Sequence, residues 1–243
     1  MKSNASILAV YLAITVTLQL TPYRGHSQEP PTFVQSDANH MIAVYDVNGH
    51  PIVNGGAETE GSPLFITKWT MGWLRLADGR MFTGVSLQLD LEKQKVYYKR
   101  LDGIEIAVEQ GQVHQLAMLD TIAGSTVAYQ FGSGYPPIDN QSETSFYLLL
   151  DSGRVCFLES IRKRLHQEKD DFAGTNSREY KVYDDFYVYV QGKMTRVKKD
   201  SKFFLELTND KHDQMDAWLK QNKVSFKSME DIRQFIHYYN GLP

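Results

Sequence analysis

Five short runs of strand-forming residues, each ending in a turn that contains glycine, constrain the fold of this chain most strongly. The five turns lie at residues 48–49, 78–79, 102–103, 151–153 and 191–192. Asn-Gly and Asp-Gly pairs readily adopt the positive φ angles of a type I′ turn, whose twist matches that of the flanking strands. Because the turn glycines are 30, 24, 50 and 39 residues apart, the spacing is too irregular for a propeller or a solenoid. An antiparallel meander is the simpler interpretation.

Further strands are predicted between these turns, and most of the connections between strands are short. The additional strands cover residues 84–91, 113–119 and 125–131. A loop rich in Gly, Pro, Ser and Asn covers 132–144, and a charged segment at 166–179 is predicted to form the tip of a long hairpin. The arms of that hairpin are 154–165 and 180–190. These features favour a strongly curved antiparallel meander, an open barrel or a sandwich over any α/β fold.

The pattern changes from strand to helix near Lys199. Apolar residues suit a short helix at 203–207 and mark one face of a second helix at 210–222. In a third helix, Ser228 is the expected N-cap and Gly241 lies where the helix should end. The chain is therefore predicted to be mainly β with a C-terminal helical segment, an α+β fold with two to three short helices packed on the sheet.

Residues 1–27 are typical of a cleaved secretory signal peptide. The apolar run at 7–20 is too short to span a bilayer as a helix, which needs about 20 residues. Gly25 and Ser27 are small residues two positions apart, as a signal peptidase requires, so we expect cleavage before Gln28. The mature protein is expected in the periplasm or the extracellular space, without a membrane span. Since no cysteine lies near the junction, no lipid anchor is expected.

The remaining chain divides into three predicted regions. Residues 28–40 form an extended leader, because Pro30 and Pro31 block a helix and no periodicity is present. Residues 41–198 form the antiparallel β domain, and residues 199–243 form the helical segment. No connector in this last region resembles a flexible linker, so we expect the helices to pack on the sheet as part of the same domain.

Charge and cysteine content argue against several partners and folds. Without residues 1–27 the chain has 24 basic and 29 acidic residues. It carries no basic stripe of the kind that neutralises phosphates, so nucleic acid is not an expected partner. Cys156 is the only cysteine, which rules out an internal disulfide and predicts a buried structural thiol.

Motifs for catalysis, metal binding and cofactor binding are absent from the sequence. It contains no His-Glu-x-x-His pair, no Gly-x-Ser-x-Gly elbow, no phosphate-binding loop and no calcium loop. The acidic pairs Asp170-Asp171 and Asp184-Asp185 are adjacent in strands, so their side chains point to opposite faces and neither pair is catalytic alone. We predict no catalytic residue, no metal site and no cofactor, which favours a protein that is not an enzyme.

Aromatic residues are the best candidates for ligand binding. The four candidates are Tyr187, Tyr189, Trp69 and Trp73. The two tyrosines share one face of the strand at 186–190, where they could contact a sugar or a protein, or could form a packing layer beneath the helices. The two tryptophans flank Gly72, and glycine in a strand often marks a bulge or a close backbone approach. A buried corner is the alternative to a ligand platform there.

Three features of the chain occur together. They are Glu60-Gly61-Ser62-Pro63 ahead of Trp69 and Gly72, the series of Asp-Gly hairpins, and the ending from Asn222-Lys223 to Tyr238-Tyr239-Asn240. In this combination the chain resembles a group of exported bacterial proteins of uncharacterised function, and the resemblance covers most of the mature chain. It implies export and a β-meander followed by helices, and it implies no catalytic residue.

The sequence leaves three hypotheses about function open. The first is a non-catalytic envelope or extracellular binding module that contacts an envelope protein, a glycan or an apolar ligand through one face of its curved sheet. The second is a hydrolase acting on an envelope or extracellular polymer, and the third is a carrier of an apolar ligand in a half-barrel. Polar groups that converge around His114, Asp184 and Tyr187 would favour the hydrolase, whereas a concave apolar cavity would favour carriage.

Overall fold

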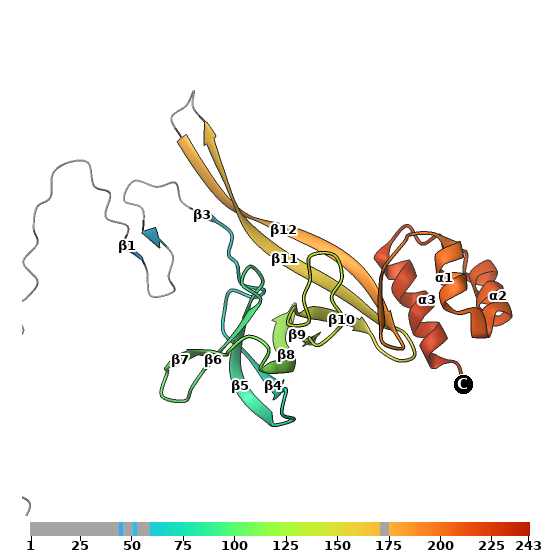
Figure 1. Ribbon diagram of the computed structural model, residues 1–243, viewed down its shortest axis with the longest axis horizontal. Coiled ribbons are helices and arrows are strands. Elements are labelled where there is room, and N and C mark those ends of the chain that lie inside the picture. The colour runs from blue at the N-terminus through green and yellow to red at the C-terminus, as the bar shows by residue number, and fades with distance from the viewer. Residues whose placement is uncertain (1–43, 46–50, 53–58, 171–174) are drawn as a thin grey trace, which may run out of the picture. The chain divides into compact units, whose positions relative to one another are not determined.

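The structure is a computed structural model that describes residues 44–45, 51–52, 59–170 and 175–243 (Figure 1). The chain divides into two compact units, Met1–Val53 and Asn54–Pro243. In the first unit, β1 (Val44–Tyr45) pairs antiparallel with β2 (Pro51–Ile52). The expected signal peptide, the leader and the turn at 48–49 lie outside the described residues, and the boundaries of the expected regions stay predictions.

The second unit is built on one eleven-stranded sheet followed by helices. Its strands are β3 (Thr59–Glu60), β4 (Thr70–Leu76), β5 (Met81–Asp90), β6 (Lys95–Lys99), β7 (Glu105–Ala107), β8 (Val113–Ile122), β9 (Ser125–Gly132), β10 (Tyr147–Asp151), β11 (Cys156–Asp170), β12 (Thr175–Val190) and β13 (Lys193–Arg196). Its helices are α1 (Ser201–Leu207), the short 3₁₀ helix η1 (Asn209–Lys211), α2 (His212–Asn222) and α3 (Met229–Gly241). The prediction of a mainly β chain with a C-terminal helical segment is confirmed.

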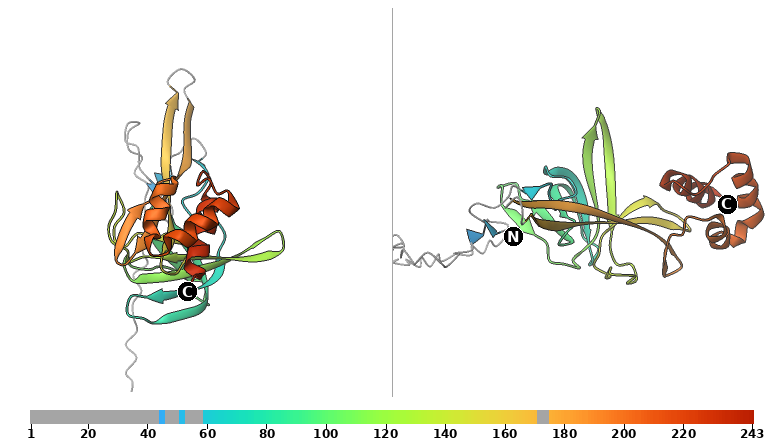
Figure 2. Two further views of the ribbon diagram at one scale, coloured as in Figure 1. Left: turned by 90° about the vertical axis from the view of Figure 1, so that its right-hand side faces the viewer. Right: turned by 90° about the horizontal axis from the view of Figure 1, so that it is seen from above.

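The strand order is that of a meander with one return. Strands β4 to β7 are neighbours in chain order, the chain then returns to the other edge of β4 with β8, and β8 to β13 follow one another. These pairs are antiparallel, whereas β3 pairs parallel with β12. The sheet is open, because β13 and β7 stand at the two ends of the order. Figure 2 shows the hairpin of β8 and β9, in green, standing out from the rest of the sheet.

The glycine turns join strands where the sequence predicts hairpins, but the turn types differ. At Gln191-Gly192 both residues have positive φ, as a type I′ turn requires. At 78–79 and 102–103 only the glycine has positive φ, and in the first of these the amide of Leu76 donates to the carbonyl of Arg80 across the loop. These two turns are three-residue hairpin loops with a left-handed glycine, a geometry that needs no positive φ at the aspartate.

The hairpin of β11 and β12 is longer than the sequence predicts. Its ladder runs without interruption from the pair Cys156 and Tyr189 to the pair Asp170 and Thr175, so strand continues through most of the charged segment expected to be a loop. Alternation along the ladder places Phe157 on one face of the hairpin and Leu158 on the other. Both side chains are fully buried, which means that both faces of the hairpin are covered at this end.

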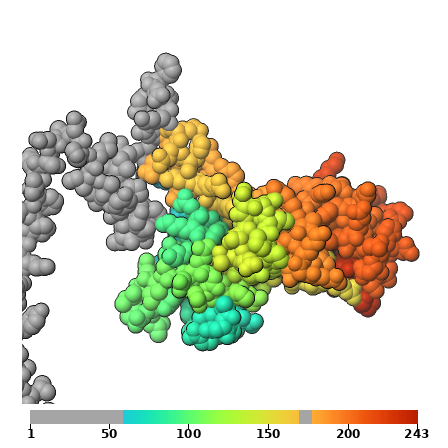
Figure 3. Space-filling model, viewed as in Figure 1, coloured from blue at the N-terminus to red at the C-terminus, as the bar shows by residue number. Residues whose placement is uncertain are grey.

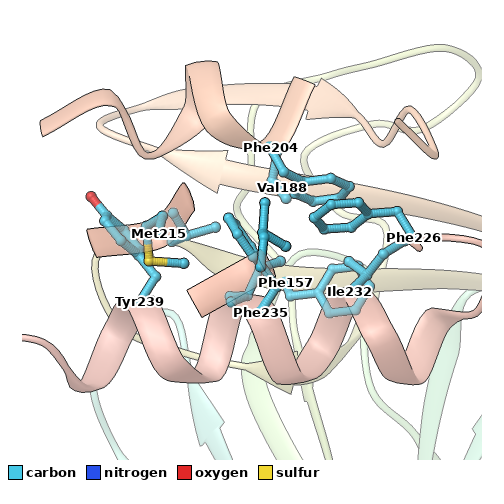
Figure 4. Packing of buried hydrophobic residues seen from close by; sticks show 11 residues of the cluster. Phe157, Val188, Phe204, Met215, Phe226, Ile232, Phe235 and Tyr239 are labelled. Carbon is cyan, nitrogen blue, oxygen red and sulfur yellow. The ribbon is translucent and has the colours of Figure 1, made fainter. Parts of the chain in front are cut away.

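The helices cover the face that carries Phe157. They bury a helical core whose members include Phe157 and Val188 of the sheet and apolar residues of α1, α2 and α3 (Figure 4). Phe204 of α1 stacks on Phe226 with ring centroids 4.6 Å apart, and Phe235 of α3 meets Phe226 edge to face at 5.2 Å. The helical segment is therefore anchored to the sheet by burial of large apolar side chains.

The side chain of Asn240 fastens α3 to the turn between β10 and β11. It accepts from the amide of Val155 at 3.0 Å, donates to the carbonyl of Val155 at 2.8 Å and donates to Asp151 at 2.7 Å. A Cβ on Gly153 would lie 2.5 Å from the side-chain carbon Cγ of Asn240. The glycine of this turn is thus required for the close approach of the helix.

A separate sheet core lies under strands β4, β5, β6, β8 and β9. Its fully buried members include Leu87, Leu89, Leu116 and Met118. The ring of Phe65, from the segment that precedes β4, closes this core by meeting Tyr129 and Phe131 edge to face at 5.0 and 4.9 Å. In Figure 3 the strands of the sheet core, in teal and green, and the helices, in orange and red, occupy different parts of this unit.

The helix ends agree closely with the sequence signals. The hydroxyl of Ser228 accepts from the amide of Asp231 at 3.0 Å, so the predicted N-cap of α3 is confirmed, and α3 ends at Gly241. Asp200 caps α1 in the same way by accepting from the amide of Phe203 at 2.8 Å. None of the helices in the described part of the chain is both long and apolar enough to cross a membrane.

Candidate functional site

The two candidate tyrosines lie on the face of β12 that points away from the helices. Tyr187 is fully buried and Tyr189 is half-buried, in a cluster with Tyr147, Leu158 and Met194. The loop at 133–146 covers this cluster through Tyr135 and Ile138. The prediction that the tyrosines pack beneath the helices is wrong, because the helices cover the alternate, apolar face of the strand.

A polar network holds this loop onto Tyr187. The hydroxyl of Tyr187 donates to the carboxylate of Asp139 at 2.8 Å, and Arg196 donates to the same carboxylate at 3.2 Å. Arg196 also pairs with Asp185, which pairs with Arg162. Burial and the bond to Asp139 raise the pKa of Tyr187 above its ordinary value. Because the network joins three strands to the loop, the contacts of Tyr187 are those of a structural residue.

Trp69 and Trp73 lie on an open face of the sheet. Neither belongs to the three buried clusters of the described chain. Along β4 the exposed Met71 and half-buried Trp73 alternate with Leu74, which faces the sheet core. On the neighbouring strand β8, Leu119 is exposed on the same side as Trp73. The structure thus brings both tryptophans onto one solvent-facing surface.

We call this surface the tryptophan face. It consists of Trp69, Met71, Trp73, Lys99 and Leu119. The ammonium group of Lys99 lies 4.5 Å from the centre of the Trp69 ring, a cation–π contact. Met71, which is 52% exposed, lies between the two tryptophans along the chain. A surface of this composition resembles the aromatic and Met-rich core of a protein interface.

The backbone beneath the tryptophan face is closely packed at Gly72. A Cβ at this position would lie 1.9 Å from the carbonyl oxygen of Ala117 on β8. The ladder between β4 and β5 shifts register next to Gly72, and Gly84 of β5 takes a positive φ of 65° there. The prediction that Gly72 marks a bulge or a close backbone approach is confirmed, since both occur.

A hollow of about 750 Å³ adjoins the tryptophan face. It is lined by Met71, by residues 83–86 of β5 and by residues 98–102 at the end of β6 and in the following turn. Five of the ten large apolar side chains that are exposed in the described chain lie in or beside these segments: Met71, Met81, Phe82, Leu101 and Ile104. Phe82 pairs with Leu74 and therefore points to the other face of the sheet from Met71. Exposed apolar side chains beside a hollow are typical of interaction sites on protein surfaces.

Two carboxylates with raised pKa values lie on another part of the sheet. Glu159 and Asp184 share one face of the hairpin of β11 and β12, on a diagonal of the ladder. Burial raises the pKa of Glu159 to about 7, and the charge of Asp184 adds to the effect. Burial and the charge of Asp185 raise the pKa of Asp184. Neither Glu159 nor Asp184 lines the hollow beside the tryptophan face.

His114, Asp184 and Tyr187 do not converge. Asp184 and Tyr187 point to opposite faces of β12, and His114 lies on β8, which is four places from β12 in the order of the sheet. Within residues 59–170 and 175–243 and the two short strands before them, no three His, Cys, Asp or Glu side chains are grouped so that they could hold a metal ion.

Part of the tryptophan face can be predicted from strand alternation in the sequence. Met71 lies two residues from Trp73, so strand alternation alone places both on one face. Leu119 and Lys99 had no such signal, because strands β8 and β6 become neighbours of this surface only through the sheet order.

No protein-family model matches this chain, and neither the curated proteins nor the solved structures contain a significant match to it.

Proposed function

We propose that this chain is an exported, non-catalytic binding module that holds a protein partner on its tryptophan face. The observation that carries the proposal is the surface formed by the exposed Met71 and the half-buried Trp69 and Trp73, with further apolar side chains around the adjoining hollow. Tryptophan and methionine are enriched in the buried centre of protein interfaces, where truncation of a tryptophan often costs more than 2 kcal/mol of binding free energy.

The export part of the proposal rests on the signal peptide expected at residues 1–27. An exported module would meet its partner in the periplasm or outside the cell. Cys156 is half-buried and not fully buried as predicted, and without a disulfide the stability of the described unit comes from its three apolar clusters.

Photo-crosslinking in the native host tests the binding surface. A benzophenone amino acid placed at Met71 should form a discrete covalent adduct with a protein. The same amino acid at Val182 of β12 is the matched control, because Val182 is 53% exposed and Met71 is 52% exposed. The adduct at Met71 should disappear when Trp69→Ala and Trp73→Ala are added. Absence of an adduct at Met71, or the same adducts at both positions, would contradict the proposal.

A glycan and an apolar ligand are the two alternative ligands for the tryptophan face. Two of the three tryptophans of the chain lie there, so intrinsic fluorescence reports occupancy directly. Titration with soluble envelope polysaccharide and with a fatty acid should leave the emission of the purified protein unchanged. A saturable shift that Trp73→Ala removes, together with no protein adduct at Met71, would replace the protein partner with that ligand.

The hydrolase alternative has one supporting observation, the pair Glu159 and Asp184. Two neighbouring carboxylates, one acting as acid and the other as base, are the basis of polymer hydrolysis, and the pKa values of both Glu159 and Asp184 are raised. Release of reducing ends or peptides from purified envelope polymer, abolished by Glu159→Gln and kept by Trp73→Ala, would favour the hydrolase over the binding module.

A further inference from the structure

Strand β5 has one edge that is only half covered. It contains ten residues, of which Ser86–Asp90 pair with β6. On the other side of residues 81–85, all but the bulged Gly84 pair with β4. Among the residues that the structure describes, no strand lies on the β6 side of this stretch. Its backbone groups on that side are therefore free to bond to an added chain.

The ladder of the hairpin shows which backbone groups face this edge. The amide of Leu76 donates to the carbonyl of Arg80, so these residues form a bonded pair between β4 and β5. Bonded and non-bonded pairs alternate in an antiparallel ladder. Phe82 therefore faces β4 with its amide and carbonyl, whereas those of Met81 and Thr83 point to the free edge.

The hollow lies against this free edge. Residues 83–86 of β5 form one wall, and residues 98–102, where β6 ends and turns toward β7, form another. A strand placed there would continue the line of β6 along β5. Five residues of strand span about 17 Å, which matches the uncovered stretch 81–85.

The side chains around the edge suit an apolar segment. Met81 and Phe82 are 49% and 42% exposed, and Leu101 of the turn is fully exposed. Natural sheet edges are usually blunted by lysine, proline or a bulge. The stretch 81–85 contains no proline and no charge, and its bulge is at Gly84, where a Cβ would have no neighbouring atom within 4 Å.

We infer that the partner of the tryptophan face is an extended polypeptide segment that adds as a strand to residues 81–85 of β5. Main-chain hydrogen bonds to Met81 and Thr83 hold it, and its alternate side chains lie in the hollow beside Met71 and Leu101. The inference rests on the proposed function, because it names the kind of partner that the tryptophan face receives.

A second copy of this chain fits the edge less well than a lone segment. In a symmetric pairing of two β5 strands about Thr83, Arg80 of one copy would lie opposite Ser86 of the other. Ser86 is already paired with Lys99 of β6. The β4–β5 hairpin of the second copy would therefore collide with β6 at Lys99. A free peptide avoids this collision because it can end before it reaches Ser86.

Backbone substitution tests the strand pairing. The probe is a peptide selected from a displayed library of random eleven-residue sequences on the purified mature protein. Thr83→Pro removes the amide that faces the edge, and it should weaken the Kd of the selected peptide at least about tenfold. The matched control is Thr83→Val, which keeps the amide and should stay within about twofold. N-methylation of alternate amides of the peptide should weaken binding as Thr83→Pro does.

Hydrogen exchange gives a readout that does not depend on the folding of a variant. The amides of Met81 and Thr83 should exchange rapidly in the free protein and become protected when the peptide is bound. Lack of protection, or a Kd that neither Thr83→Pro nor N-methylation changes, would overturn the inference. If Trp73→Ala still abolishes peptide binding in that case, the proposed function stands and only the strand pairing fails. A dimer in sedimentation that Thr83→Pro dissolves would assign the edge to a second copy instead.

Discussion

Single residues in this protein are often explained by what lies across the sheet from them. Gly72 is required because the carbonyl oxygen of Ala117 occupies the place of a side chain. Tyr187 looks like a binding residue in the sequence, yet its hydroxyl is used to hold Asp139 of the covering loop. In both cases the neighbour comes from a distant part of the chain, so local sequence could suggest the special position but could not identify the contact.

Replacement of Gly72 by alanine should destabilise the fold severely. A Cβ 1.9 Å from the carbonyl oxygen of Ala117 forces β4 and β8 apart, and we expect a loss of about 3 kcal/mol or more in the free energy of unfolding. Gly241→Ala at the end of α3 is the control, because a Cβ there meets no atom within 4 Å. Urea denaturation followed by circular dichroism measures both variants. Equal midpoints for the two would show that β4 and β8 are not so close.

Glu159 should make stability depend on pH near neutrality. Its pKa in the folded protein is about 7, above the ordinary value of 4.5, so folding favours the protonated form. The stabilisation that the protonated Glu159 gives to the folded state is complete below pH 4.5 and is lost as the pH rises through 7. The side chain of the Glu159→Gln variant cannot ionise, so its stability lacks this pH dependence. The free energy of unfolding of the wild type should therefore fall relative to that of Glu159→Gln by about 1–3 kcal/mol between pH 5 and pH 8.

Chemical denaturation at a series of pH values measures this difference. Glu206→Gln, on the exposed surface of α1, should follow the wild type at every pH. If the Glu159→Gln and wild-type curves stay parallel from pH 5 to pH 8, the carboxyl group is not desolvated in the folded protein.

The secondary-structure elements follow the sequence signals where the signals are local. The turn at Gln191-Gly192 and the N-cap at Ser228 were predicted and are confirmed. The turn between β8 and β9 was not predicted, because it uses Ala123 in a left-handed conformation ahead of Gly124. Alanine rarely adopts that conformation, so the local sequence does not indicate a turn at this position. The turn forms because β8 and β9 pair on either side of it.

The contact between α3 and the turn of β10 and β11 should be essential for stability. Asn240→Ala removes three hydrogen bonds and leaves the amide and carbonyl of Val155 without their partner. We expect a loss of about 2–4 kcal/mol in the free energy of unfolding. His237→Ala is the control, since His237 also contacts Asp151, at 2.9 Å, but its side chain is 81% exposed. Thermal unfolding should show a large decrease in Tm for the first variant and a shift of about 1–2 °C or less for the second.

The protein as a whole combines an N-terminal segment expected to direct export with a unit of sheet and helices. The unit Asn54–Pro243 includes both the sheet core and the helical core. The proposed function adds that one surface of this unit, the tryptophan face, is left uncovered for a partner.

Export can be tested on the intact protein. Expressed from its own sequence in a bacterial host, the chain should be found outside the cytoplasm with Gln28 as its first residue, as measured by intact mass and N-terminal sequencing. Replacing an apolar residue in the middle of the run 7–20 by arginine should keep the full-length chain in the cytoplasm. Recovery of an uncleaved exported chain would instead indicate an anchor.

Strand, turn and helix positions could be predicted from this sequence because their signals are local. Period-two alternation, left-handed glycines and capping residues act over a few residues, and they specified a mainly β chain with helices at its end. The open sheet, the placement of β8 on the other edge of β4 after β7, and the free edge of β5 were decided by the tertiary structure alone. Pairing partners depend on which distant apolar faces bury one another, and no local pattern records that choice. The same reason separates the two pairs of candidate aromatics: loop 133–146 covers Tyr187, while Trp69 and Trp73 stay on an open face.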